Sequence, residues 1–355
     1  MSTERSYGRA LGELRAADAE SFGGKSAGLG ELIAAGIPVP PGFAISAAAF
    51  TAFLEEAGLG ERVEAVLAAL DPTDAQAVAF ASHHLGESMR SAPVPQELRA
   101  ELARRYAELD ERAEAPVAVR SSALGEDSHE ATFAGQQESY LWVRGADSVA
   151  DAVRDCWVSL YSPPAISYRA RMGSGGAGPA AMGVTVQLMV DAEISGVMFT
   201  CNPVSGDPSV TAINASWGLG LAVVGGEVTP DYYLVSKVTG EVLRQDVCSK
   251  DVQYVAGPER RGAVRTKVPP ERREAACLDA ARLAELVALA RSVHRHFGCH
   301  QDIEWASDRD GGLHVVQSRP VTAAPKPAAQ APAAASAIAL VMSTFGAAGS
   351  GGGGS

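Results

Sequence analysis

Two short runs near the C-terminal end of the chain hold the side chains best suited to chemistry. Asp302 and Glu304 stand two residues apart in one run, and Gln317 and Arg319 stand two residues apart in the next. The link between the runs, residues 307–312, has the composition of a hairpin turn. Because side chains alternate faces along a strand, each pair is expected to share one face of a β-hairpin.

Two carboxylates beside a guanidinium suit a divalent cation and a polyphosphate. In nucleotide sites Mg²⁺ is typically held by one or two carboxylates together with substrate phosphates, and arginine grips phosphate oxygens in a planar fork. The same residues would also make an ordinary cross-strand ion pair on a protein surface. The hairpin by itself leaves both interpretations open.

Lys25 is a second candidate, because it stands among glycines in Phe22-Gly23-Gly24-Lys25-Ser26-Ala27-Gly28 at the start of a predicted helix. The run does not fit a P-loop, since position 19 is alanine where the first glycine would stand, and no apolar strand leads into it. A lysine at a helix start can still reach a phosphate, because the helix N-terminus favours negative charge.

Arg120 ends a predicted strand and enters the loop Ser121-Ser122-Ala123-Leu124-Gly125, and Gly135 follows in a run that permits close backbone approach. Hydroxyls, backbone amides and an arginine can form an anion cradle; a polar loop with a capping serine is the alternative. Further on, Gln187 and Met189 end a predicted strand that could face an adenine edge, or be plain core.

The bulk composition limits the class of protein. The chain has 355 residues, of which 46% are hydrophobic and 20% charged, enough for two or three packed units. Its net charge of −12 argues against general nucleic-acid affinity. Five cysteines without a C-x-x-C pair indicate a reducing compartment. No apolar run approaches the ~18 residues of a membrane span, and no signal peptide is visible, so we expect a cytoplasmic protein without a membrane partner.

Hydrophobic periodicity and residue propensity predict both helices and strands. We expect helices over residues 26–33, 47–70, 74–90, 95–111, 146–172 and 271–297, and strands over residues 117–120, 184–190, 196–200 and 211–215 in addition to the hairpin. Gly298 is expected to cap the last helix in the left-handed conformation. Residues 323–355 are rich in Ala, Pro and Gly and are expected to form a linker or tail.

Together these segments resemble the N-terminal nucleotide-binding domain of the phosphoenolpyruvate synthase and pyruvate phosphate dikinase family, which is an ATP-grasp module. The resemblance runs from about residue 22 to residue 322. It rests on motifs in family order: Gly-Gly-Lys-Ser-Ala-Gly-Leu-Gly at 23–30, Pro-Val-Pro-Pro-Gly-Phe at 38–43, Val-Arg-Ser-Ser-Ala at 119–123, Phe-Ala-Gly-Gln-Gln at 133–137, Gly-Val-Met-Phe-Thr at 196–200, Ser-Trp-Gly-Leu-Gly at 216–220, Asp-Ile-Glu-Trp at 302–305 and Gln-Ser-Arg-Pro at 317–320.

The resemblance implies two α+β subdomains that sandwich ATP, residues 1–186 and 187–322. It implies catalytic or phosphate-binding roles for Lys25, Arg120 and Arg319. It also implies ATP contacts near Gly135, an adenine-side hinge at Gln187 and Met189, and Mg²⁺ and nucleotide ligands at Asp302, Glu304 and Gln317. One departure is Leu221, since the family often has a glutamate there.

Family members pass phosphate from ATP to a histidine on a separate swivelling domain, within a Thr/Ser-His-Ala type motif. This chain has no such motif. The resemblance therefore implies a partner subunit or domain that carries the phosphohistidine, and a small-molecule acceptor bound elsewhere, as in phenylphosphate synthase or pyruvate, water dikinase. A non-catalytic ATP sensor and the N-terminal domain of a rifampicin phosphotransferase-like enzyme are the alternatives.

Overall fold

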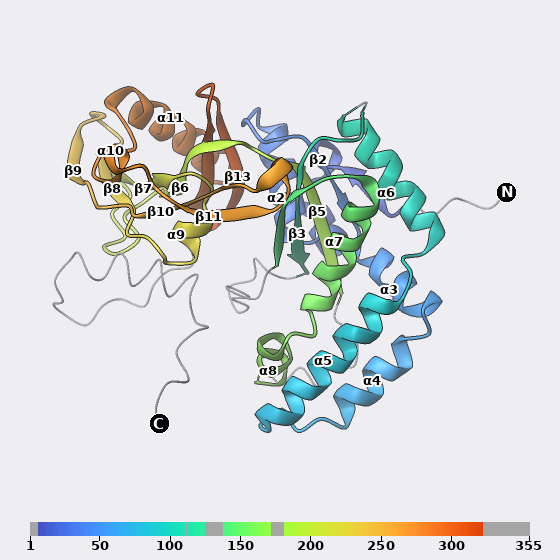
Figure 1. The fold of residues 1–355 in the computed structure, drawn as a ribbon. Helices are drawn as coiled ribbons and strands as arrows, with labels where there is room; N and C mark the ends of the chain where they lie inside the picture. Colours follow the sequence, from blue (N-terminus) through green and yellow to red (C-terminus); the bar gives the residue numbers. More distant parts are fainter. Residues whose placement is uncertain (1–5, 111, 125–137, 172–180, 322–355) are drawn as a thin grey trace. The chain divides into compact units, whose positions relative to one another are not determined.

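The chain folds into helices and antiparallel sheets, which Figure 1 shows as a ribbon. This computed structural model describes residues 6–110, 112–124, 138–171 and 181–321, with the side chains of 168–171 excepted. Unit 1 consists of Met1–Gly30, Pro41–Met189 and Arg260–Gly262, and unit 2 consists of Glu31–Pro40, Val190–Glu259 and Ala263–Ser355. The domain limits at 186 and 322 stay predictions, and the expected tail lies outside the described residues.

Unit 1 is built on a five-stranded sheet in which all neighbouring strands are antiparallel. Its order is β1 (Gly8–Ala10), β2 (Gly42–Ile45), β5 (Met182–Leu188), β3 (Val117–Ala123) and β4 (Ser139–Val143). Val184 and Val186 of β5 join the main hydrophobic core together with Val117 and Val119 of β3. Because strand side chains alternate, the odd-numbered residues of β5 and the even-numbered residues of β3 line the opposite face of the sheet.

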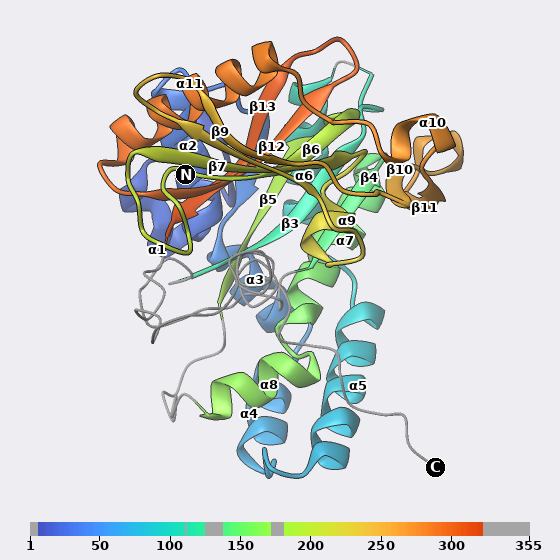
Figure 2. The same ribbon diagram turned by 90° about the vertical axis from the view of Figure 1, so that its left-hand side faces the viewer.

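Three helices contact this sheet directly on its core side: α3 (Ala47–Glu56), α6 (Gln96–Leu109) and α7 (Ala146–Ser159). α5 (Ala75–Ser91) packs on α7, and α4 (Gly60–Ala68) and α8 (Pro163–Arg171) pack on α5. Trp157 of α7 stacks on Phe53 of α3 with ring centroids 5.4 Å apart, at the centre of the core. Figure 2 shows α4 and α8 beside α5, where the three helices extend away from the sheet. On the other side of the sheet, α1 (Ala19–Phe22) leads into α2 (Gly24–Ala34).

Two of the helices predicted for unit 1 are each divided in two. The single helix predicted over 47–70 is α3 and α4, because Gly58 between them has a left-handed φ of +63°. The helix predicted over 146–172 is α7 and α8. Pro163 opens α8, a position where the fixed φ of proline is favourable and its missing N–H costs nothing.

Unit 2 is built on a six-stranded antiparallel sheet with the hairpin at one edge. Its order is β13 (Leu313–Pro320), β12 (Gln301–Asp308), β6 (Ala192–Phe199), β7 (Val210–Trp217), β8 (Asp231–Ser236) and β9 (Val242–Asp246). A separate ribbon pairs β10 (Val252–Ala256) with β11 (Ala263–Lys267), and α9 (Leu221–Val224) packs on β10. The strands β8 to β11 were absent from the sequence prediction.

The prediction of one long helix over 271–297 is partly wrong. The structure has two helices there, the short α10 (Pro270–Arg273) and the long α11 (Ala280–Phe297), and α11 packs against β12 (Figure 1). The expected apolar stripe of α11 is buried at Leu283, Leu286, Val287, Ala290 and Val293. Gly298 caps α11 with a φ of +68°, as predicted. Among the described residues, no helix combines the length and the apolar character that a membrane crossing requires.

A buried ion pair fixes the connection between β8 and α11. The side chains of Asp231 and Lys250 are both completely inaccessible to solvent and are hydrogen-bonded to each other. The backbone N–H of Cys248 donates to Asp231 Oδ1 at 3.0 Å, and that of Cys277 donates to Oδ2 at 2.8 Å. The Tyr233 hydroxyl donates to Oδ2 at 3.3 Å. One carboxylate therefore joins three separate segments of unit 2.

We predict that Asp231→Asn lowers the free energy of unfolding by about 3–5 kcal/mol, because it leaves the Lys250 ammonium buried without its counter-charge. Guanidinium chloride denaturation measures the change. Asp251→Asn is the matched control, since the Asp251 side chain is 72% exposed and lies 3.9 Å from Arg273; we expect a change within about 0.5 kcal/mol. Equal losses in the two variants would contradict a special role for the buried pair.

Candidate functional site

The hairpin of β12 and β13 brings the four predicted residues onto one face. Asp302 lies directly opposite Arg319, and Glu304 lies directly opposite Gln317. Directly opposed residues of an antiparallel pair point to the same side of the sheet, so the predicted sharing of a face is confirmed. A β-bulge follows Glu304, where the register shifts by one residue on β13. The bulge changes the register only beyond the four residues.

Asp302 and Arg319 form a close, largely buried pair. Arg319 approaches Asp302 Oδ2 with Nε at 3.0 Å and Nη2 at 2.9 Å. The Asp302 side chain is only 5% exposed, and its Oδ1 has no hydrogen-bond partner within the part of the chain that the structure describes. Burial raises the pKa of Asp302 from 3.8 to about 6; Glu304 adds to the rise and Arg319 opposes it. The pair therefore presents a carboxylate oxygen that is poorly solvated.

An apolar surface continues from these polar groups on the same face. Phe199 of β6 lies opposite Asp302, and Val197 lies opposite Glu304. With Ala212 of β7 they form a small buried cluster. This surface was not singled out from the sequence, because each strand viewed alone has the pattern of ordinary core. Only the pairing of β6 with β12 shows that it adjoins the carboxylates.

The opposite face of the same sheet is the packed side. Ile303 and Trp305 of β12 are buried, with 0% and 1% of their surface exposed. Tyr233 of β8 belongs to this face by register, and its hydroxyl accepts a hydrogen bond from the Leu278 N–H just before α11. The sheet thus separates a core that involves α11 from the face that carries Asp302.

In unit 1, Lys25 is the second residue of α2 and is buried. Its Nζ donates to the Ser121 carbonyl at 3.0 Å. Gly23 has a left-handed φ of +83°, and a Cβ there would lie 2.2 Å from the Ser122 carbonyl oxygen. Gly23, two residues before Lys25, therefore permits close packing of the helix start on β3. The sequence motif has at least this structural role.

Arg120 and Gln187 share the face of the five-stranded sheet that lies away from the helical core. Arg120 is directly opposite Thr185, and Gln187 is two residues further along β5. Thr185 Oγ1 lies 2.7 Å from Ser26 Oγ, so the start of α2 packs on this face as well. Within unit 1 the structure thus gathers Lys25, Arg120 and Gln187 on one side of one sheet.

Met189 follows β5, and its backbone N–H donates to the Pro116 carbonyl at 2.9 Å. Gly135 lies outside the described residues. Leu221, the departure from the family pattern, begins α9, and the next two residues are buried. The individual roles expected for the candidate residues stay predictions.

The four side chains on this face of the hairpin offer carboxylate groups, the amide of Gln317 and the guanidinium of Arg319. In the described part of the chain no three His, Cys, Asp or Glu side chains gather as metal ligands. A cation held by Asp302 and Glu304 would therefore need further oxygen ligands from a bound molecule or from water, which is the usual arrangement for Mg²⁺ in nucleotide sites.

Comparison with known proteins gives a consistent family. The profile described as pyruvate phosphate dikinase, AMP/ATP-binding domain matches residues 19–338. The phosphoenolpyruvate synthase of Pyrococcus furiosus is 40% identical over 87% of this chain and 43% of that protein. The phosphoenolpyruvate synthase of Pseudomonas aeruginosa is 39% identical over 89% of this chain and 42% of that protein.

The chain spans less than half of the length of these relatives. The probable phosphoenolpyruvate synthase of Methanocaldococcus jannaschii is 38% identical over 88% of this chain but only 26% of that protein. Among solved structures, D-cycloserine synthetase DcsG covers 88% of this chain and 66% of its own at 12% identity, with a TM-score of 0.30, too remote to support an argument.

The predicted α+β class is confirmed by the helices and antiparallel sheets of both units, and the ATP-grasp type stays a prediction. The resemblance predicted from the motifs is confirmed too, since both the profile and the relatives cover most of the chain. This chain belongs to the family of pyruvate phosphate dikinase AMP/ATP-binding domains.

Proposed function

We propose that this ATP-binding domain is the phosphate-donating part of a dikinase-type phosphotransferase. It binds Mg-ATP and passes phosphate to a histidine carried by a swivelling domain or subunit that is not contained in the described residues. The small-molecule acceptor binds to that other part of the enzyme. Relatives named phosphoenolpyruvate synthases, which are much longer than this chain, support an enzyme of several domains.

The observation that carries the proposal is the register of the hairpin. It sets Asp302 against Arg319 and Glu304 against Gln317 on a sheet face that is not the α11 core. Burying a carboxylate as deeply as Asp302 is costly unless its charge is compensated. A site that receives a cation and an anionic substrate explains why such a costly arrangement is present.

Asp302 and Glu304 fit a Mg²⁺ ion by the chemistry of their oxygens. Asp302 Oδ1 is buried and has no partner among the described residues. When bound, the ion would neutralise charge that develops on the transferred phosphate. Gln317, opposite Glu304, adds an amide that can contact the same ligand.

Arg319 is the residue proposed to stabilise the phosphoryl group during transfer. Its Nε–H donates to Asp302 Oδ2 at 3.0 Å, and its Nη2 lies 2.9 Å from the same oxygen, so Asp302 orients the guanidinium. In the step, the acceptor imidazole nitrogen bonds to phosphorus while the bridging P–O bond breaks, and the nucleotide leaves with the bonding electrons. Positioned positive charge is the main contribution that a protein makes to such a transition state.

Two further sets of residues are assigned by the same proposal. Lys25 and Arg120 contact the phosphates of ATP. Gln187 and Met189 contact the adenine, and the apolar surface around Phe199 offers a second contact for the nucleoside. The buried position of Lys25 supports its role, because an ammonium group shielded from water interacts more strongly with phosphate.

We predict that Arg319→Ala lowers phosphoryl transfer by about 10²–10³-fold, the usual loss for a positioned donor at a transition state. ATP affinity should change much less, because the lost contact forms mainly during transfer. Labelled ATP and candidate histidine-bearing partner proteins measure the transfer, and calorimetry measures the affinity.

Arg309→Ala is the control for this variant, since Arg309 lies in the same hairpin turn with a side chain 60% exposed. Arg319→Lys keeps the charge near Asp302 and tests whether the planar fork matters. A domain that binds ATP but phosphorylates none of the partner proteins would refute transfer and favour an ATP sensor.

We predict that ionisation of the buried Asp302 carboxyl lowers the free energy of unfolding as the pH rises. Its pKa is raised from 3.8 to about 6 in the folded protein, so the folded state holds this proton more tightly than the unfolded state. Stability contributed by the protonated carboxyl is present below pH ~4 and is lost as the pH rises to about 6, by up to about 3 kcal/mol. Without ligand, the free energy of unfolding of Asp302→Asn relative to wild type should therefore increase as the pH rises from 4 to 7. A constant difference across that range in denaturation experiments would contradict this.

A further inference from the structure

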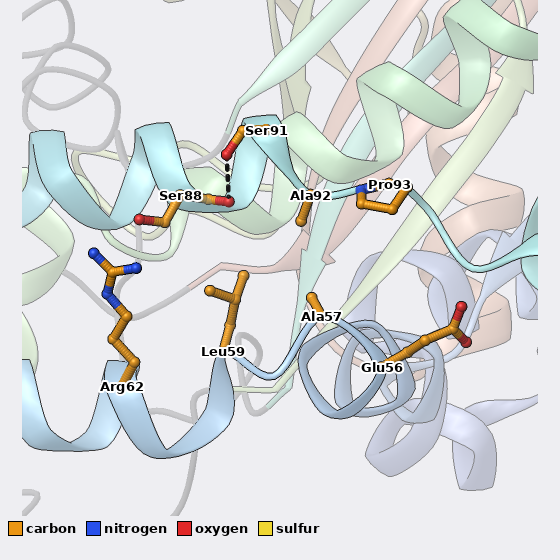
Figure 3. A pocket seen from close by; sticks show the side chains of 8 residues that line it. All are labelled: Glu56, Ala57, Leu59, Arg62, Ser88, Ser91, Ala92 and Pro93. Atoms are coloured by element: carbon orange, nitrogen blue, oxygen red, sulfur yellow. Dashed lines mark hydrogen bonds between the residues drawn. The ribbon is translucent and has the colours of Figure 1, made fainter.

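A pocket of about 450 Å³ opens in the helical part of unit 1 and contains none of the residues discussed above for ATP. It lies where the end of α3 and the start of α4 meet the end of α5, as Figure 3 shows. The lining side chains are those of Glu56, Ala57, Leu59, Arg62, Ser88, Ser91, Ala92 and Pro93. Its volume is in the range of sites for small organic ligands, roughly 300–1,000 Å³.

The pocket has an apolar middle and two polar ends of opposite charge. Ala57, Leu59 and Ala92 face its central part in Figure 3. The guanidinium of Arg62 lies at one end, and the carboxylate of Glu56 lies at the other. A ligand that fills the pocket therefore meets a cation and an anion separated by an apolar stretch.

The two serines face the pocket as hydrogen-bond acceptors. Ser88 Oγ donates to the His84 carbonyl at 2.8 Å, and the Ser91 hydroxyl is shared between the Glu87 carbonyl at 2.9 Å and the Ser88 carbonyl at 3.0 Å (Figure 3). A hydroxyl has a single hydrogen, so both hydroxyls have used their donor on the helix backbone. The lone pairs that remain suit an N–H group of a ligand and exclude a second anion.

Arg62 is positioned by a neighbour on α5. Its Nη2 is hydrogen-bonded to His84 Nε2, and the His84 ring stacks on Phe80 with centroids 6.2 Å apart. Arginine can only donate, so His84 Nε2 is the acceptor of this hydrogen bond. The guanidinium is thereby held beside Ser88, where its planar fork can receive a carboxylate.

We propose that this pocket binds a short peptide with free termini and small side chains. The peptide carboxylate contacts Arg62, its backbone N–H groups donate to Ser88 and Ser91, and its ammonium group contacts Glu56. The apolar middle accommodates the intervening backbone and side chains. This site is independent of the ATP site, and its failure would leave the proposed phosphotransferase function untouched.

Triglycine and its blocked forms test the proposal by NMR titration of the ¹⁵N-labelled chain. Triglycine should shift the backbone amides of Ala57, Leu59 and Ala92 in a saturable way. N-acetyl-triglycine and triglycinamide should each bind at least about threefold more weakly, the effect of losing one partly exposed ion pair. Equal binding of all forms, or no shift at these amides up to the solubility of triglycine, would overturn the proposal.

Paired variants assign the two ends. Arg62→Gln should abolish the preference for a free carboxylate while keeping that for a free amine, and Glu56→Gln should do the reverse. Glu55→Gln and Arg99→Gln are matched controls, because both residues are exposed and neither lines the pocket. Loss of binding in the controls equal to that in the pocket variants would also overturn the assignment.

Discussion

The antiparallel pairing of β12 with β13 is the constraint on which the proposed chemistry depends. Side chains alternate with a period of two, so a slip of one residue would turn Asp302 and Glu304 into the core and expose Ile303 and Trp305. Burial of Ile303 and Trp305 therefore fixes the strand register that places the two carboxylates on the opposite face. The stability of the core side and the geometry of the polar side are properties of a single pairing.

The strand register places the buried Asp302 carboxyl beside Arg319, where its charge is only partly compensated. Arg319 offsets only part of the cost of burying Asp302, which is why the pKa of the carboxyl remains high. A pair that is incompletely compensated in the absence of ligand is a poor source of stability. It is well suited to a site that gains favourable charge interactions when a cation arrives.

Much of the fold and of the hairpin face could be predicted from local sequence patterns. The shared face of Asp302 and Glu304 follows from alternation alone, and Gly298 as a helix cap follows from glycine's tolerance of positive φ. The strands β9 to β11 escaped prediction because their partly exposed residues lack an alternating pattern. β8 does alternate in burial, but its sequence Tyr-Tyr-Leu-Val at 232–235 is continuously apolar and hides the alternation. The break before α11 escaped it too, since the anchoring of Cys277 on Asp231 joins residues 46 positions apart.

Some properties of the site are not local in the sequence at all. The raised pKa of Asp302 depends on burial by neighbouring strands, and the apolar surface at Phe199 depends on which strand pairs with β12. The pocket at Arg62 depends on how the ends of three helices meet. Such features can be identified only from the tertiary fold, whereas the motif around Lys25 could be recognised in the amino-acid sequence.

The strand order of unit 1 has a consequence for synthesis of the chain. β5 lies between β2 and β3, which do not pair with each other, yet it is the last of the five strands to be made. A nascent chain that ends before about residue 188 has two partial sheets without their shared central strand. Their unpaired edges remain open to misassembly until β5 leaves the ribosome. Folding of unit 1 on the ribosome is therefore expected to be a late, single event rather than a stepwise one.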